Sequence, residues 1–156
     1  YDFFVNEHDA LFTVQDSISL RGNIKGSHSK NLFLKNKNNN FFLLSCEEKD
    51  EINLKKISKS LNLGNVSFAK EEYLELYLGI KPGSVSPFAL LNDIGCIVSF
   101  YLEKALYESR FVNFHPLVNS LTITMATDKF VEFMIENKKK IHIFSSLEGK
   151  ILKTYE

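Results

Sequence analysis

Two apolar runs separated by a short polar stretch place the strongest constraint on how this chain can fold. The runs are Leu32–Leu34 and Phe41–Leu44, and the stretch between them, Lys35–Asn40, consists only of lysine and asparagine. Asparagine tolerates the left-handed backbone conformations that tight turns require. The pattern therefore predicts a β-hairpin between the two runs.

The remaining periodicity predicts a mixture of helices and strands. Apolar side chains recur every three or four residues in 51–61, 70–78 and 127–140, which is typical of amphipathic helices. Gly79 is expected to end the second helix and Thr127 to cap the third. Strand-like runs occupy 97–102, 111–114 and 120–125. Because strands outnumber helices and intermingle with them, we predict a mixed α/β fold: a curved, barrel-like β-sheet with short helices packed outside.

The composition fits one domain over residues 1–156 and narrows the classes of partner. The 19 basic and 19 acidic residues balance, so the chain lacks the cationic surplus needed to wrap a large nucleic-acid surface, although it could grip one nucleic-acid end. No apolar run approaches the ~18 residues of a membrane span. Cys46 and Cys96 lack C-x-x-C spacing and are expected to be small buried residues of a cytoplasmic protein. The scattered four histidines and two cysteines favour neither a metal site nor a cofactor.

Three segments could carry chemistry, and each has a structural alternative. Lys30 opens an apolar strand, where its ammonium could hold a phosphate or simply face solvent. The segment 79–87 contains two glycines and two prolines, so its backbone amides could hold a carbonyl or oxyanion, or the loop could be a plain crossover. His115 precedes Pro116 and could act as a general base or bind a sugar hydroxyl, or be structural. The tract 90–95 predicts only a turn.

No familiar nucleophile or phosphate-binding motif is present. The sequence contains no G-x-S-x-G elbow, no Walker-type loop, no dinucleotide fingerprint and no H-E-x-x-H. An enzyme with this sequence would therefore work by positioning a substrate and a water rather than by covalent chemistry.

Taken in order, six segments resemble the YbaK/ProX family of aminoacyl-tRNA editing domains, most closely its freestanding ProX/PrdX-like branch. The resembling segments are 8–14, 28–34, 66–69, 79–88, 91–93 and 114–117. The family's lysine in K-N-L-F-L falls on Lys30, and its F-H-P histidine falls on His115. Its G-x-x-x-P loop falls on Gly83, Ser84, Val85, Ser86 and Pro87. The sequence departs from the family at Ser86, where threonine is common, and at Ala89, where glycine is common. The tail after Phe144 shows no such resemblance.

The resemblance implies a cytoplasmic trans-editing hydrolase that removes alanine from mischarged tRNA(Pro) without a metal or cofactor. Lys30 would hold a phosphate near the tRNA 3′ end, the Gly83–Pro87 amides the ester carbonyl, and His115 the terminal ribose or the water. Asn31, Phe12 and Thr13 are further substrate-contacting candidates, the last two as walls of the side-chain pocket. The implied partners are the acceptor end of mischarged tRNA and prolyl-tRNA synthetase. Alternatives are the same fold acting on Cys-, Ser- or Thr-mischarged tRNA, and a non-catalytic module that binds a tRNA end or a synthetase.

Overall fold

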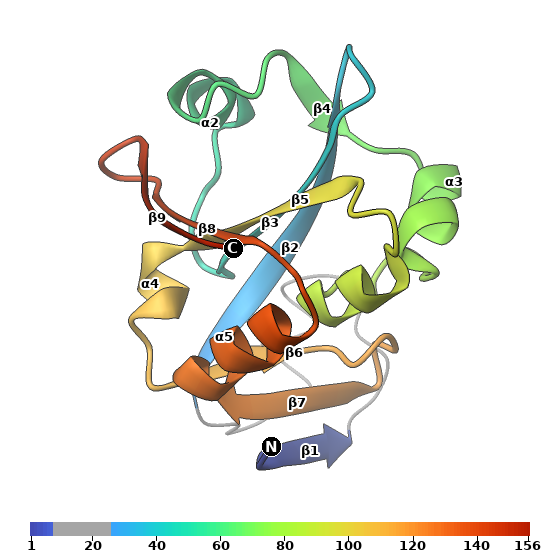
Figure 1. Cartoon of the computed structure of the whole chain (residues 1–156), viewed down its shortest axis with the longest axis vertical. Coiled ribbons are helices and arrows are strands. Elements are labelled where there is room, and N and C mark those ends of the chain that lie inside the picture. The colour runs from blue at the N-terminus through green and yellow to red at the C-terminus, as the bar shows by residue number, and fades with distance from the viewer. Residues whose placement is uncertain (8–25) are drawn as a thin grey trace.

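The computed structural model describes residues 1–7 and 26–156, which form one mixed β-sheet with short helices around it (Figure 1). The strands are β1 (Phe3–Glu7), β2 (Ser27–Asn36), β3 (Phe41–Glu47), β4 (Val66–Phe68), β5 (Val98–Glu103), β6 (Phe111–Phe114), β7 (Leu121–Ala126), β8 (Ile141–Ser145) and β9 (Lys150–Tyr155). The helices are α2 (Leu54–Ser60), α3 (Glu71–Tyr73), α4 (Lys104–Tyr107) and α5 (Thr127–Glu136), with a π-helix η1 (Leu74–Leu78) and a 3₁₀-helix η2 (Pro87–Asn92).

The long strand β2 joins the two halves of the sheet. Along the sheet the order is β1-β7-β6-β2-β3-β5-β8-β9, with β4 also paired to β2. The pairs β2–β6, β3–β5 and β5–β8 are parallel, whereas the other pairs are antiparallel. Figure 1 shows β2 crossing the molecule between the β6–β7–β1 half and the β3–β5–β8–β9 half. The predicted mixed α/β fold on a curved sheet is confirmed.

The predicted hairpin is the β2–β3 pair. Lys35 lies opposite Phe41, and the turn between them passes through Asn39, whose φ is +60°. Asn36 fastens this turn, because its side-chain oxygen accepts hydrogen bonds from the backbone amides of Asn38 (3.0 Å) and Asn40 (2.9 Å). The asparagines therefore act in the turn as the sequence indicates, both by backbone conformation and by local hydrogen bonding.

Alternation along the strands divides the apolar residues between two clusters. Phe33, Leu43 and Phe100 point to one face of the sheet, where a large cluster is covered by α5, η1 and η2. Leu34 and Leu44 point to the opposite face and form a smaller cluster with Ile57 and Leu61 of the α2 region. The two faces of β2 therefore contact different apolar clusters. The position of a polar residue along β2 decides which of the two clusters its side chain lies beside.

The helices differ from the sequence-based expectation at their ends. Gly79 stops the second predicted helix with φ +64°, as expected, although that helix changes from α to π geometry at Leu74. The third helix begins at Thr127 but ends at Glu136, four residues before the predicted end. The predicted cap by Thr127 is wrong: Ala126 occupies the N-cap, and the buried Thr127 hydroxyl has no hydrogen-bond partner. No helix of the described ranges is long and apolar enough to cross a membrane.

The two cysteines lie in contrasting environments. Cys46 is buried in β3, and burial raises the pKa of its thiol to about 12, against the opposing effect of the Lys30 charge. Cys96 is exposed, so the expectation that both are buried is wrong for this residue. Cys96 lies in the surface turn between Asp93 and β5, where its φ is +52° and its backbone amide donates to the Asp93 carbonyl (3.1 Å).

Candidate functional site

Lys30 lies on β2, and His115 directly follows β6, the strand that pairs with β2 in parallel. The β2–β6 pairing matches Ser27 with Val112 and His28 with Asn113. The pairing ends there, two residues before Lys30 and two before His115. Residues two apart on a strand share a face, so Lys30 lies on the side of His28, away from the large apolar cluster. The parallel pairing thus brings both predicted site residues to the same end of the β2–β6 pair.

The Lys30 side chain is partly buried and already has one hydrogen-bond acceptor. Its Nζ donates to the backbone carbonyl of Asp50, just after β3. A carbonyl orients the ammonium without neutralising its charge, and no ion pair of Lys30 occurs within the described ranges. An ammonium in this setting could attract a phosphate.

The imidazole of His115 is fixed by the loop that returns to β7. Its Nδ1 lies 2.9 Å from the carbonyl oxygen of Leu121. A carbonyl can only accept, so Nδ1 carries the proton and, in the neutral ring, the lone pair is on Nε2. That tautomer gives His115 an acceptor of the kind needed to bind a hydroxyl or a water.

Asn31 points to the opposite face from Lys30. Its side chain donates to the Ser29 hydroxyl (3.3 Å) and accepts from Ser45 on β3. Ser29 in turn donates to the backbone oxygen of Asn113 (3.1 Å). The structure therefore places Asn31 in a network that links β2 to β3 and β6, and this placement lends no support to substrate contact.

Sequence reasoning did not single out Asn113, although it is a buried polar residue beside the site. Its amide donates to the Ser27 carbonyl (3.2 Å) and its oxygen accepts from the Thr124 hydroxyl. Asn113 therefore ties β6 to both neighbouring strands directly beneath His115. The signal was available as a lone asparagine in the otherwise apolar run Phe111–Phe114, because a buried polar group needs partners.

The Gly83–Pro87 loop packs mainly against the large apolar cluster. Ser84, Ser86 and Pro87 are buried, and the next residue, Phe88, contacts Phe114 and Phe130 edge to face. Phe114 belongs to the same cluster, so the loop leads into η2 on the side of the sheet that this cluster covers.

The backbone of the loop is nevertheless tightly specified. Gly83 has φ +88°, a conformation that favours glycine, and the Ser84 amide closes a turn onto the Lys81 carbonyl (3.2 Å). Ser86 is the N-cap of η2, where its hydroxyl accepts from the Phe88 amide (3.2 Å). The buried Ser86 hydroxyl therefore has a structural role.

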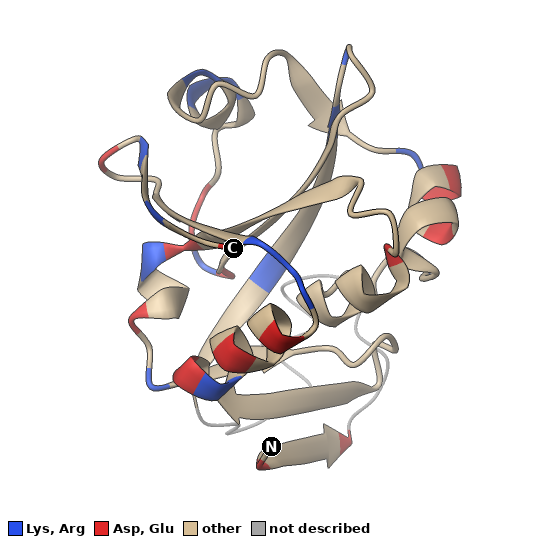
Figure 2. Cartoon of the chain, viewed as in Figure 1, with Lys and Arg blue, Asp and Glu red and all other residues tan. Residues whose placement is uncertain are grey.

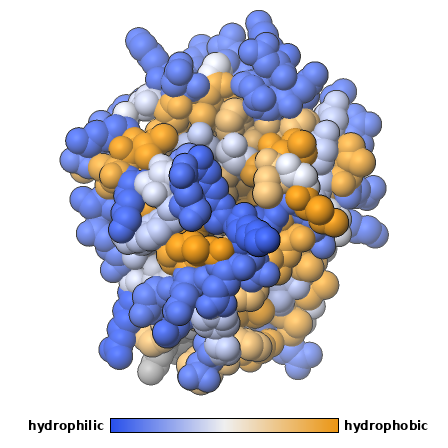
Figure 3. All heavy atoms as spheres, in the orientation of Figure 1, coloured by the Kyte–Doolittle hydropathy of each residue, from blue (hydrophilic) through white to orange (hydrophobic). Residues whose placement is uncertain are grey.

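Charge is unevenly distributed over the surface. Figure 2 shows acidic residues along α5 and α3, and basic residues on α2 and in the segment between α5 and β8. Figure 3 shows apolar residues in separate patches among hydrophilic ones on the face in view. No group of three or more metal-ligating side chains occurs in the ranges that the structure describes. Phe12 and Thr13, the predicted pocket walls, lie outside those ranges.

Comparison with known proteins identifies the family. Residues 8–133 match the family model described as "Aminoacyl-tRNA editing domain". The chain is 37% identical over 133 residues to "Prolyl-tRNA synthetase associated domain-containing protein 1" of Xenopus laevis, covering 82% of this chain and 79% of the relative. It is 30% identical over 132 residues to "Prolyl-tRNA editing protein ProX" of Acetoanaerobium sticklandii, covering 84% of this chain and 80% of that relative.

A solved structure shows the same fold at low sequence identity. It is described as "Crystal structure of a putative trans-editing enzyme for prolyl tRNA synthetase", with TM-score 0.67, 17% identity, and coverage of 89% of this chain and 83% of that one. The extent of the family match and the sequence identity to the two relatives agree with the six family-like segments of the sequence and with the observed fold. The chain belongs to the aminoacyl-tRNA editing domain family.

Proposed function

We propose that this chain is a trans-acting deacylase that hydrolyses mischarged tRNA, with alanyl-tRNA(Pro) as its preferred substrate. The observation that carries the proposal is that Lys30 and His115, a cation and an oriented imidazole, lie at the same end of the β2–β6 pair in a chain of the editing family. In this proposal the cation holds the polyanionic tRNA end and the imidazole contacts its terminal ribose.

The chemistry requires positioning more than activation. An aminoacyl ester is already reactive, so the protein must hold its carbonyl in the reactive geometry and place a water beside it. In this proposal Lys30 binds a phosphate near the 3′ end, and His115 uses Nε2 to bind the terminal ribose or the attacking water. The Gly83–Pro87 amides are the proposed carbonyl holders, an assignment that rests on the family resemblance.

The amino-acid preference is the first test. A synthetase pocket made for proline cannot strongly exclude alanine, because the smaller side chain loses only ~1–3 kcal/mol of binding. A separate pocket sized for a methyl group would admit alanine and exclude the proline ring, at a cost of ~1–3 kcal/mol or more from overpacking. We expect deacylation of alanyl-tRNA(Pro) at least about tenfold faster than that of prolyl-tRNA(Pro), measured side by side with the cysteinyl and seryl esters.

The outcomes of that time course separate the alternatives. Preference for the cysteinyl or seryl ester would keep an editing deacylase and replace alanine as its substrate. Efficient hydrolysis of prolyl-tRNA(Pro) would contradict an editing role. Tight tRNA binding without release of any amino acid would instead favour a non-catalytic tRNA-end module.

Substitutions in the loop distinguish backbone from side-chain roles. Gly83→Val should abolish most deacylation, because valine fits neither the φ of +88° nor a close approach of the ester. Ser84→Ala should keep near-normal turnover. Ser86→Ala should also turn over normally when folded, but lose about 1 kcal/mol of stability with its cap. Turnover is measured on protein shown to be folded by circular dichroism; elimination of activity by either serine substitution alone would indicate a covalent mechanism.

A further inference from the structure

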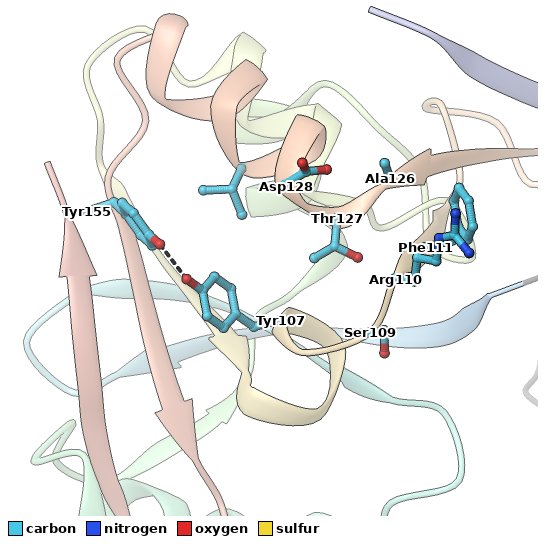
Figure 4. Close-up of a pocket in the computed structure, with 9 residues that line it drawn as sticks. Tyr107, Ser109, Arg110, Phe111, Ala126, Thr127, Asp128 and Tyr155 are labelled. Carbon is cyan, nitrogen blue, oxygen red and sulfur yellow. Dashed lines mark hydrogen bonds between the residues drawn. The ribbon is translucent and has the colours of Figure 1, made fainter.

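A cavity lies at the N-terminus of α5, at the opposite end of β6 from His115. It has a volume of about 650 Å³ and is formed where α4, β6, β7, α5 and the end of β9 meet. Its lining includes Tyr107, Arg110, Thr127, Asp128 and Tyr155. In Figure 4 the two tyrosines lie on one side of the cavity and Arg110 on the other, with Thr127 between them.

The polar side of this cavity has an unsatisfied donor. Thr127 is only 4% exposed, yet its hydroxyl has no hydrogen-bond partner. Buried hydroxyls are almost always hydrogen-bonded, because an unpaired one costs free energy. Figure 4 shows the Thr127 side chain projecting from the first turn of α5 toward the space between the tyrosines and Arg110. An occupant of this cavity would provide the missing partner.

Two further features make the polar side suitable for an anion. Ala126 at the N-cap offers no polar side chain to the first turn of α5, and a helix N-terminus carries partial positive charge. The guanidinium carbon of Arg110 lies 5.4 Å from the centroid of the Phe111 ring, and Arg110 is exposed, without an ion pair in the described ranges. A guanidinium can present two donors to a phosphate.

The other side offers flat apolar surface. The hydroxyls of Tyr107 and Tyr155 are hydrogen-bonded to each other, so these residues present rings more than polar atoms to the cavity. Val131, one turn beyond Thr127 on α5, adds to the apolar lining. A nucleobase gains affinity by stacking on an aromatic ring.

We propose that this cavity is a nucleotide-binding subsite, in which the phosphate is held by Arg110, the Thr127 hydroxyl and the first turn of α5, and the base lies against Tyr107 and Tyr155. One lining group opposes an anion: the Asp128 carboxylate, which accepts from the Lys129 amide (2.9 Å). The charge of Asp128 therefore lowers the expected affinity for an anion. Removing that charge should raise the affinity, whereas removing Arg110 or the Thr127 hydroxyl should lower it. The proposal does not depend on deacylase activity.

The test uses 5′-AMP, adenosine and inorganic phosphate as probes on the whole chain, by isothermal titration and amide chemical-shift mapping. We expect 5′-AMP to bind more tightly than either fragment and to shift the amides of Thr127 and Asp128. Thr127→Val, which keeps the shape, should weaken 5′-AMP binding about tenfold, the effect of losing one hydrogen bond to a charged group. The same variant should melt at a higher temperature than wild type, because it removes the unpaired hydroxyl.

Further variants separate this site from general charge effects. Arg110→Gln should weaken binding about tenfold, whereas Asp128→Asn should tighten it several-fold by removing a like charge. Lys129→Gln is the control: its Nζ pairs with Glu132 at 3.1 Å on exposed surface, so binding should change less than about twofold. Equal affinity for adenosine and 5′-AMP, or unchanged binding in Thr127→Val and Arg110→Gln, would overturn the proposal.

A final arm identifies the source of the phosphate. If it belongs to tRNA, 5′-AMP should compete with deacylation, and Thr127→Val should raise KM while leaving kcat unchanged. If the ligand is a free nucleotide, 5′-AMP should bind and neither kinetic constant should respond to Thr127→Val. Both results require binding at the cavity, and because that binding is measured without tRNA, its failure is distinct from failure of the deacylase proposal.

Discussion

Lys30→Ala is expected to reduce kcat/KM for alanyl-tRNA(Pro) roughly 30- to 150-fold, the loss of about 2–3 kcal/mol that removal of a charged hydrogen bond produces. The fold should survive, because the side-chain hydrogen bond of Lys30 within residues 1–7 and 26–156 is one donated to the neutral Asp50 carbonyl. The salt dependence of tRNA binding should also fall by about one unit of slope, since one phosphate contact is removed.

Lys37→Ala is a matched control for this substitution. It removes the same charge from the same hairpin, but Lys37 is exposed in the turn, away from His115. We expect it to leave kcat/KM within about twofold, as for most surface charges. Wild-type turnover by a folded Lys30→Ala protein would refute the assignment of Lys30.

The register between β2 and β6 adds a test of geometry. If Lys30 and His115 hold the same substrate end, the effects of Lys30→Ala and His115→Ala on kcat/KM should not add, with a coupling of about 0.5–3 kcal/mol. Strict additivity would indicate that the two side chains act at separate places.

Asp93→Ala is expected to cause the largest loss of stability, about 3 kcal/mol, because one buried carboxylate satisfies two backbone amides. It accepts from the Ile97 amide at 3.1 Å and from the Val98 amide at 2.7 Å, and so fixes the entry to β5. Hydrogen bonds to charged groups are worth about 1.5–3 kcal/mol each, and the bond to the Val98 amide is buried. A decrease in melting temperature of roughly 6–12 °C should follow.

Two further variants show whether the carboxylate is the cause. Asp93→Asn keeps one acceptor oxygen and should lose about half as much stability. Glu108→Ala removes a carboxylate from an exposed pair with Lys104 (3.7 Å) and should cost less than about 0.5 kcal/mol. Chemical denaturation of the three proteins is the measurement, and an Asp93→Ala protein as stable as wild type would show that solvent replaces the carboxylate.

Local sequence signals determined the kinds of element and several of their ends. The hairpin between Leu32–Leu34 and Phe41–Leu44 and the stop at Gly79 follow from side-chain periodicity and from backbone conformations that few residues tolerate. The six segments that resemble the editing family, taken in their order along the chain, also sufficed to indicate that family. Each of them reflects a local backbone and side-chain requirement.

Long-range contacts decided the rest. The placement of Lys30 and His115 at the same end of the β2–β6 pair depends on a parallel pairing that no local pattern encodes, because parallel strands are brought together by intervening elements rather than by a turn. The exposure of Cys96 and the missing partner of Thr127 likewise depend on what packs against each residue. Sequence alone thus determined the elements and the family, while the choice of which side chains share a face, and hence the candidate site, belonged to the tertiary structure.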